Sequence, residues 1–228
     1  MPYTKTIVCL ANSRKLNGRC VAGREWDGSK FGPWVRPIGS AQKGELYSER
    51  YYENGNDPQL LDVIELSLLR PQPTTYQSEN HLVNANKRWQ RLDMLKVSQL
   101  DRAVEVLKGS LWLDGSSTGN GENDKVAQDA AAGLPNSLAL VQPKRLIMII
   151  DTEGAAFGNA RRRVRGTFSL NGKNYILAVT DPRVERELRK EEDGSSRELK
   201  NPVLCISLSE IFEKQNACYK LIAGVIET

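Results

Sequence analysis

Four arginines and a lysine lie close together in the second half of the chain: Arg161, Arg162, Arg163, Arg165 and Lys173. The segment 144–173 holds seven basic and two acidic residues, so its charge of +5 exceeds the +4 of the whole chain. Guanidinium groups bind phosphates in bidentate geometry, and a cluster of this density predicts a surface that binds a polyanion. The alternative is that arginine keeps an exposed strand face soluble.

A β-hairpin is predicted to position this cluster. Asn171-Gly172 lies between two runs rich in β-branched and aromatic residues, a pattern that favours a two-residue type I′ turn. Such a turn would place Arg163 and Arg165 together on the solvent side of the hairpin. It would also bring four pairs face to face: Leu170 with Lys173, Phe168 with Tyr175, Gly166 with Leu177, and Val164 with Val179.

The N-terminal part of the chain offers a second set of candidate binding residues. Trp26, Phe31 and Trp34 could stack on nucleobases. The basic residues near them that could bind phosphates include Arg14, Lys15 and Arg36. The alternative is that the tryptophans fill the interior of a small β-domain.

Residues for other chemistry are sparse, and we predict neither a cofactor nor a metal ion. His81 is the only histidine, and the four cysteines, none in a C-x-x-C pair, are expected to be buried thiols without a disulfide. Glycine-rich phosphate loops and zinc-binding motifs are missing from the sequence. One alternative for a metal is Mg²⁺ held by carboxylates at strand ends, with these candidates: Asp151, Glu153 and Asp181.

Composition is ordinary for a globular protein, with 39% hydrophobic and 26% charged residues in 228. The longest aliphatic run, residues 146–150, is far shorter than a membrane span, and the N-terminus lacks the regions of a signal peptide. We therefore expect a cytoplasmic protein without a membrane partner.

The predicted elements are mostly short strands with a few short helices. Strands are expected at residues 4–12, 20–26, 60–69, 137–141, 145–151, 203–208 and 219–226, and helices at 46–52, 98–108 and 183–190. Residues 114–136 are rich in Gly, Ser, Asn and Asp, which favours a flexible linker. This divides the chain into a first barrel at 1–113, a linker at 114–136 and a second barrel at 137–228.

Several short motifs give the chain a family resemblance. They are Cys9-Leu10-Ala11-Asn12-Ser13-Arg14-Lys15, Gly18-x-Cys20-Val21-Ala22-Gly23, Trp34-Val35-Arg36-Pro37, Ser207-Leu208 and Cys218-Tyr219-Lys220-Leu221-Ile222-Ala223. Over nearly its whole length the chain resembles the dual OB-containing domain of prokaryotes. The resemblance implies two OB-like β-barrels in tandem, and a family expected to recognise nucleic acid or nucleotides in bacterial conflict and antiviral systems.

The sequence thus favours a non-catalytic module that binds nucleic acid or senses a nucleotide, and the family resemblance implies that it belongs to a bacterial antiviral defence system. Its predicted interface combines the basic hairpin with aromatic residues. Two alternatives are a metal-dependent nuclease or nucleotide-processing enzyme, and a sensor subunit that binds a protein partner in a defence complex.

Overall fold

The computed structural model describes residues 1–41 and 43–228, which fold into two compact units. Unit 1 comprises Met1–Val104 and Pro135–Leu138, and unit 2 comprises Glu105–Leu134 and Ala139–Thr228. Each unit therefore contains two separate stretches of the chain.

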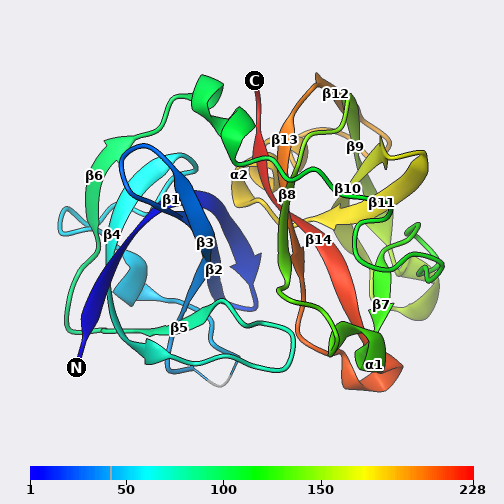
Figure 1. Ribbon diagram of the computed structural model, residues 1–228. Helices are drawn as coiled ribbons and strands as arrows, with labels where there is room; N and C mark the ends of the chain where they lie inside the picture. The colour runs from blue at the N-terminus through cyan, green and yellow to red at the C-terminus, as the bar shows by residue number, and fades with distance from the viewer. Residues whose placement is uncertain (42) are drawn as a thin grey trace. The chain divides into compact units, whose positions relative to one another are not determined.

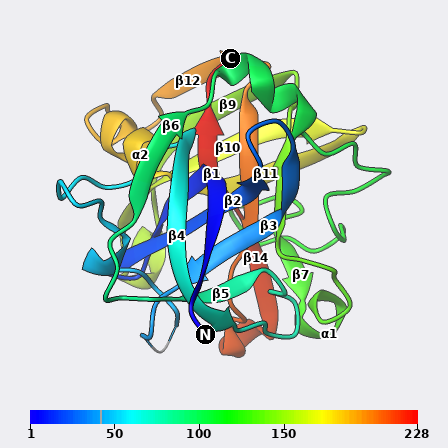
Figure 2. The ribbon, with the colours of Figure 1, turned by 60° about the vertical axis from the view of Figure 1, so that its left-hand side comes forward.

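Unit 1 is a closed five-stranded barrel with one additional strand. Its strands are β1 (Tyr3–Lys15), β2 (Gly18–Trp26), β3 (Phe31–Ile38), β4 (Asp62–Pro71), β5 (Asn80–Val83) and β6 (Gln90–Met94). The sheet order is β1-β2-β3-β5-β4-β6, and β4 also pairs with β1, which closes the barrel (Figure 1). Figure 2 shows β1 and β4 side by side where the barrel closes. The pairing of β3 with β5 is parallel.

Unit 2 has the same order of five strands. Its strands are β7 (Lys125–Ala127), β8 (Leu138–Val141), β9 (Arg145–Glu153), β10 (Arg161–Leu170), β11 (Lys173–Val179), β12 (Ser196–Lys200), β13 (Val203–Leu208) and β14 (Ala217–Ile226). Within the sheet order β12-β9-β10-β11-β14-β13-β8, the series β9-β10-β11-β14-β13 corresponds to β1-β2-β3-β5-β4. The pairing of β11 with β14 is parallel, like that of β3 with β5. The protein thus consists of two OB-like barrels in tandem, as predicted.

The apolar side chains of these strands form the core of each unit. Ile7, Val35 and Ile64 are completely buried in unit 1. In unit 2, Phe168 packs on Tyr175 with a centroid distance of 5.2 Å and an interplanar angle of 19°. This contact fixes which face of the β10–β11 hairpin is buried, because successive side chains of a strand point to opposite faces.

The predicted hairpin is confirmed. β10 pairs with β11 so that Leu170 lies opposite Lys173, Phe168 opposite Tyr175, and Gly166 opposite Leu177. Asn171 and Gly172 adopt φ angles of 51° and 76°, as a type I′ turn requires.

The helices are few and short. They comprise the α-helices α1 (Gln128–Ala131) and α2 (Pro182–Leu188) and the 3₁₀ helices η1 (Ser48–Arg50), η2 (Val97–Arg102), η3 (Ala155–Phe157) and η4 (Glu213–Gln215). The helix predicted at 98–108 is wrong in type and length, since η2 ends at Arg102 and the Glu105 amide donates to the Leu140 carbonyl. A hydrogen bond to a distant part of the chain replaces the hydrogen bonds within a helix that the spacing of apolar residues in 98–108 predicted. α2 lies where a helix was predicted, and Glu185 and Arg189 form the expected pair, at 3.1 Å.

The predicted linker at 114–136 differs from what the structure describes there. Residues 114–134 belong to unit 2, where they contribute β7 and α1, while Pro135 and Asn136 belong to unit 1. Three residues of β7 pair with β14 at Ala217, Cys218 and Tyr219. Backbone pairing therefore holds a segment whose composition alone favours flexibility.

A candidate nucleic-acid interface in unit 2

Ligands of OB folds bind across strands 2 and 3, between the loop that joins strands 1 and 2 and the loop that joins strands 4 and 5. In unit 2 these parts are β10 and β11, the β9–β10 loop (154–160) and the β13–β14 loop (209–216). All four contribute to one pocket of about 430 Å³, which we call the unit 2 pocket. Its lining residues are Thr118, Gly119, Asn120, Asp124, Glu153, Gly154, Phe157, Asn159, Arg161, Arg163, Arg165, Ala178, Phe212, Tyr219, Lys220 and Leu221.

Strand β10 places three arginines on the pocket side, since alternate residues share a face. Arg161 is exposed and donates from Nε to Asn159 Oδ1 at 3.0 Å. Within residues 1–41 and 43–228 it forms no ion pair. The side chain of Arg163 is 43% exposed, and its Nε lies 3.6 Å from Glu153 Oε2. Because a guanidinium has five N–H donors, both side chains retain donors for a ligand at the pocket rim.

Arg165 lies deeper and is held by acidic side chains. It is 17% exposed, donates from Nη2 to Glu153 Oε2 at 3.1 Å, and has Nη1 3.8 Å from Asp124 Oδ2. Burial raises the pKa of Glu153, but the hydrogen bond and the charge of Arg165 outweigh that effect and hold the pKa below its ordinary value. Glu153 is therefore ionised at neutral pH and neutralises Arg165.

Exposed aromatic rings belong to the two loops that flank the pocket. Phe157, in the β9–β10 loop, is 90% exposed, and Phe212, in the β13–β14 loop, is 44% exposed. Gly154 and Gly158, on either side of Phe157, have φ angles of 77° and 68°, a backbone conformation that residues other than glycine rarely adopt. The Phe212 ring lies 6.0 Å from that of Tyr219 on β14. The pocket thus offers aromatic surfaces on which a nucleobase could stack.

The other two basic residues of the hairpin do not line this pocket. Arg162 donates from Nε to Asp193 Oδ1 at 2.8 Å and from Nη1 to the Arg189 carbonyl at 2.8 Å. It thereby ties β10 to the chain that follows α2. Lys173 is exposed at the start of β11, next to the turn. The sequence prediction grouped residues that the strand alternation separates.

The two residues predicted to bind a ligand on the corresponding face of unit 1 are buried. On β3, Val35 points into the core, and yet its neighbours Trp34 and Arg36 on the opposite side are also buried. Arg36 Nη2 donates to Ser137 Oγ at 2.8 Å and lies 3.3 Å from Glu79 Oε1. Ser137 and Glu79 therefore already occupy the guanidinium of Arg36, which is not available to a ligand.

The remaining predicted residues of unit 1 lie at the end of the β1–β2 hairpin. Arg14 is exposed and pairs in register with Arg19, and Lys15 is half-buried opposite Gly18. Trp26 and Phe31 contact each other at 4.8 Å between centroids.

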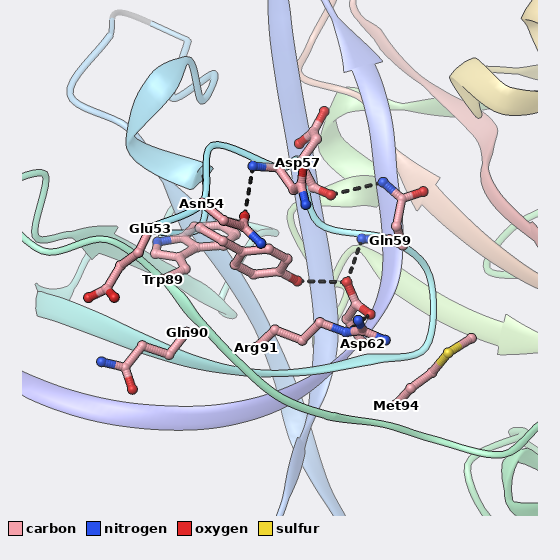
Figure 3. A pocket seen from close by; sticks show the side chains of 11 residues that line it. Glu53, Asn54, Asp57, Gln59, Asp62, Trp89, Gln90, Arg91 and Met94 are labelled. Atoms are coloured by element: carbon pink, nitrogen blue, oxygen red, sulfur yellow. Dashed lines mark hydrogen bonds and ion pairs between the residues drawn. The ribbon is translucent and has the colours of Figure 1, made fainter.

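Unit 1 has a larger pocket of about 700 Å³, but its charge is wrong for phosphate (Figure 3). Its described lining contains three acids and a single cation, Arg91, whose Nε lies 2.7 Å from Oδ1 of the buried Asp62. Asp62 also accepts from the Tyr52 hydroxyl at 2.7 Å and from the Gln59 amide at 2.9 Å. Burial, followed by the hydrogen bond to Asp62, raises the pKa of Tyr52 well above its usual value. The Trp89 ring is completely buried and presents no face for stacking.

Two of the three carboxylates considered for a metal ion have other structural roles. Asp181 is the N-cap of α2 and accepts from the amides of Arg183 and Val225 at 3.0 and 3.1 Å. Glu153 binds Arg165, and Asp151 is exposed opposite Arg163 in the β9–β10 register. Among the described residues no three His, Cys, Asp or Glu side chains form a group that could hold a metal ion. Within the same residues no helix is long and apolar enough to cross a membrane.

The sequence prediction missed Phe157, Phe212, Tyr219 and Lys220 as pocket residues. A phenylalanine in the glycine-flanked stretch Gly154-Ala155-Ala156-Phe157-Gly158 was the available signal, because a loop has no interior in which to bury such a ring. Lys220 gave no signal, since it lies in an apolar strand. In the structure it is completely buried, and its Nζ lies 3.0 Å from Asp114 Oδ1.

Comparisons with known proteins agree with this architecture. Searches of curated proteins and of solved structures gave no match. The sequence profile of the family described as "Dual OB-containing domain" matches residues 5–225. The chain therefore belongs to the dual OB-containing domain family.

Proposed function

We propose that the protein binds single-stranded nucleic acid or a nucleotide at the unit 2 pocket, without catalysing a reaction on it. The observation that carries this proposal is that Arg161, Arg163, Phe157 and Phe212 meet in one pocket on the face where OB folds bind their ligands. Guanidinium groups would bind phosphates, and the phenylalanine rings would stack on bases.

Three further observations support unit 2 over unit 1. On the corresponding face of unit 1, the buried Arg36 is already bound by Ser137 and Glu79. The larger pocket of unit 1 has a net negative lining, which would repel phosphate. Arg161, in contrast, forms no ion pair in the described part of the chain, so a phosphate would not have to displace a carboxylate from it.

The test is a binding screen by fluorescence anisotropy against labelled single-stranded DNA, single-stranded RNA, duplexes and nucleotides. Replacing Phe157 with alanine should weaken binding of a single strand by about 5- to 150-fold, which is the contribution of one stacked base. Val106→Ala is the matched control, because Val106 is 93% exposed and does not line the pocket.

Equal binding by the wild type and Phe157→Ala would contradict the proposal, as would a preference for duplex over single strands. The role in bacterial antiviral defence, a protein partner in such a system and a cytoplasmic location stay predictions.

A further inference from the structure

We infer that the unit 2 pocket takes one nucleoside at the end of a strand, or a free nucleotide, and does not let a continuous strand pass through. This inference rests on the proposed function and specifies its ligand. Two observations support it. One is a third wall of the pocket, in addition to the β9–β10 and β13–β14 loops, and the other is the difference in charge between the rim of the pocket and its interior.

The third wall is the segment 116–124, which precedes β7. It is joined to β11 through Glu122 and Ile176, whose backbone groups exchange hydrogen bonds of 3.2 and 3.0 Å. Asn123 Nδ2 donates to the Asn174 carbonyl, also on β11, at 2.9 Å. β7 then continues along β14. The segment therefore lies between the first halves of β11 and β14. The two strands pair directly with each other only from Ala178 and Leu221 onward.

This wall is braced from within. Asp124 accepts from the amide of Thr118 at 2.7 Å and from its hydroxyl at 2.6 Å. Gly121 allows the close approach, because a Cβ there would lie 2.0 Å from Asp124 Oδ2. Together with the β9–β10 and β13–β14 loops, the wall leaves a pocket of about 430 Å³, within the range of small-ligand pockets.

Charge differs between the interior and the rim. Inside, Arg165 is paired with Glu153, and the Lys220 ammonium donates to Asp114 at 3.0 Å and to the Leu113 carbonyl at 2.7 Å. These interior charges are already compensated, and a phosphate would meet carboxylates there. Arg161 and Arg163 at the rim keep open donors, so the nucleoside would enter and its phosphate would stay at the rim.

The experiment compares a linear oligonucleotide with the same sequence closed into a circle, in DNA and in RNA, together with nucleoside monophosphates. A circle has no end, so we expect it to bind the wild-type protein about 5- to 150-fold more weakly than the linear form, by loss of one stacked base. Tight binding of a monophosphate would identify a free nucleotide as the source, and tight binding of the linear strand alone would identify a strand end.

A variant pair tests the position of the ligand. Gly119 lines the pocket, and a Cβ there would meet no atom of the described residues within 4 Å, so Gly119→Leu should fill the pocket without disturbing the fold. Gly133→Leu is the control, because Gly133 lies outside the pocket, where a Cβ would make only an ordinary contact of 3.7 Å with the Ala130 carbonyl. Gly119→Leu should weaken linear binding to the level of the circle, and Gly133→Leu should leave it unchanged.

Circular and linear forms that bind equally to each other and more tightly than the monophosphates, or an affinity unchanged by Gly119→Leu, would overturn the inference and leave the proposed function intact. Failure of every strand and nucleotide to bind would overturn both.

Discussion

Replacing both Arg161 and Arg163 with alanine should reduce the salt dependence of binding to single strands by a calculable amount. Each phosphate contact contributes about 0.7 to the slope of log affinity against log salt for single strands, so two lost contacts lower the slope by ~1.4. Over the roughly fourfold change from about 50 to about 200 mM salt, the affinity advantage of the wild type should shrink about sevenfold. Arg165 is left in place because Glu153 already neutralises it.

Anisotropy titrations of one labelled strand across that salt range give the slope directly. The control is the double variant Arg162→Ala, Arg189→Ala, which removes the same charge from side chains that bind Asp193 and Glu185 outside the pocket. If the first variant keeps the wild-type slope, Arg161 and Arg163 do not contact phosphate. If the control lowers the slope equally, the change in slope results from the net charge of the protein and not from contacts in the pocket.

Three predictions concern stability. Phe168→Ala should lower the free energy of unfolding by about 3–5 kcal/mol in urea titrations, because its ring is buried against Tyr175; a loss below ~1 kcal/mol would contradict that packing. Burial raises the pKa of Tyr175 to about 12, above its ordinary 10, so the folded state keeps a proton that the unfolded state loses. This stabilisation is fully present below pH ~10 and should disappear by about pH 12. The free energy of unfolding of the wild type relative to Tyr175→Phe should therefore fall by about 2–3 kcal/mol over that range. A difference between the two proteins that does not change with pH would refute the prediction. Glu79→Ala should lower the free energy of unfolding by ~3–5 kcal/mol, because it leaves the buried guanidinium of Arg36 without its carboxylate. Glu198→Ala, which breaks an exposed pair with Arg145, should lower it by at most about 1 kcal/mol. Equal losses in urea titrations would show that burial does not strengthen the Arg36–Glu79 pair.

Local patterns predicted the elements that depend on local chemistry. The register of the β10–β11 hairpin followed from Asn171-Gly172, and α2 followed from the four-residue spacing of Glu185 and Arg189, because turns and pairs within a helix depend on a few neighbouring residues. The helix expected at 98–108 failed because the Glu105 amide bonds to a strand far away in the sequence.

The candidate site was only partly predictable for the same reason. Strand alternation correctly placed Arg163 beside Arg165, but whether a guanidinium is open to a ligand depends on carboxylates brought by other segments, as Asp124 and Glu153 show. The role of Phe157 and Phe212, which are 55 positions apart in the chain, depends on two loops that meet only once the barrel has formed.

The interleaving of the two units has a consequence for the order in which the protein is made. Arg36 and Glu79 leave the ribosome long before Ser137, the residue that completes their buried cluster, and the first thirty residues of unit 2 are synthesised in between. The first barrel can form its strand pairs early, but it must wait for residues 135–138 before its buried ion pair is enclosed. A polypeptide stalled anywhere in 105–134 would carry that charged pair open to water, and a nascent chain of this length should be more sensitive to protease in unit 1 than the finished protein.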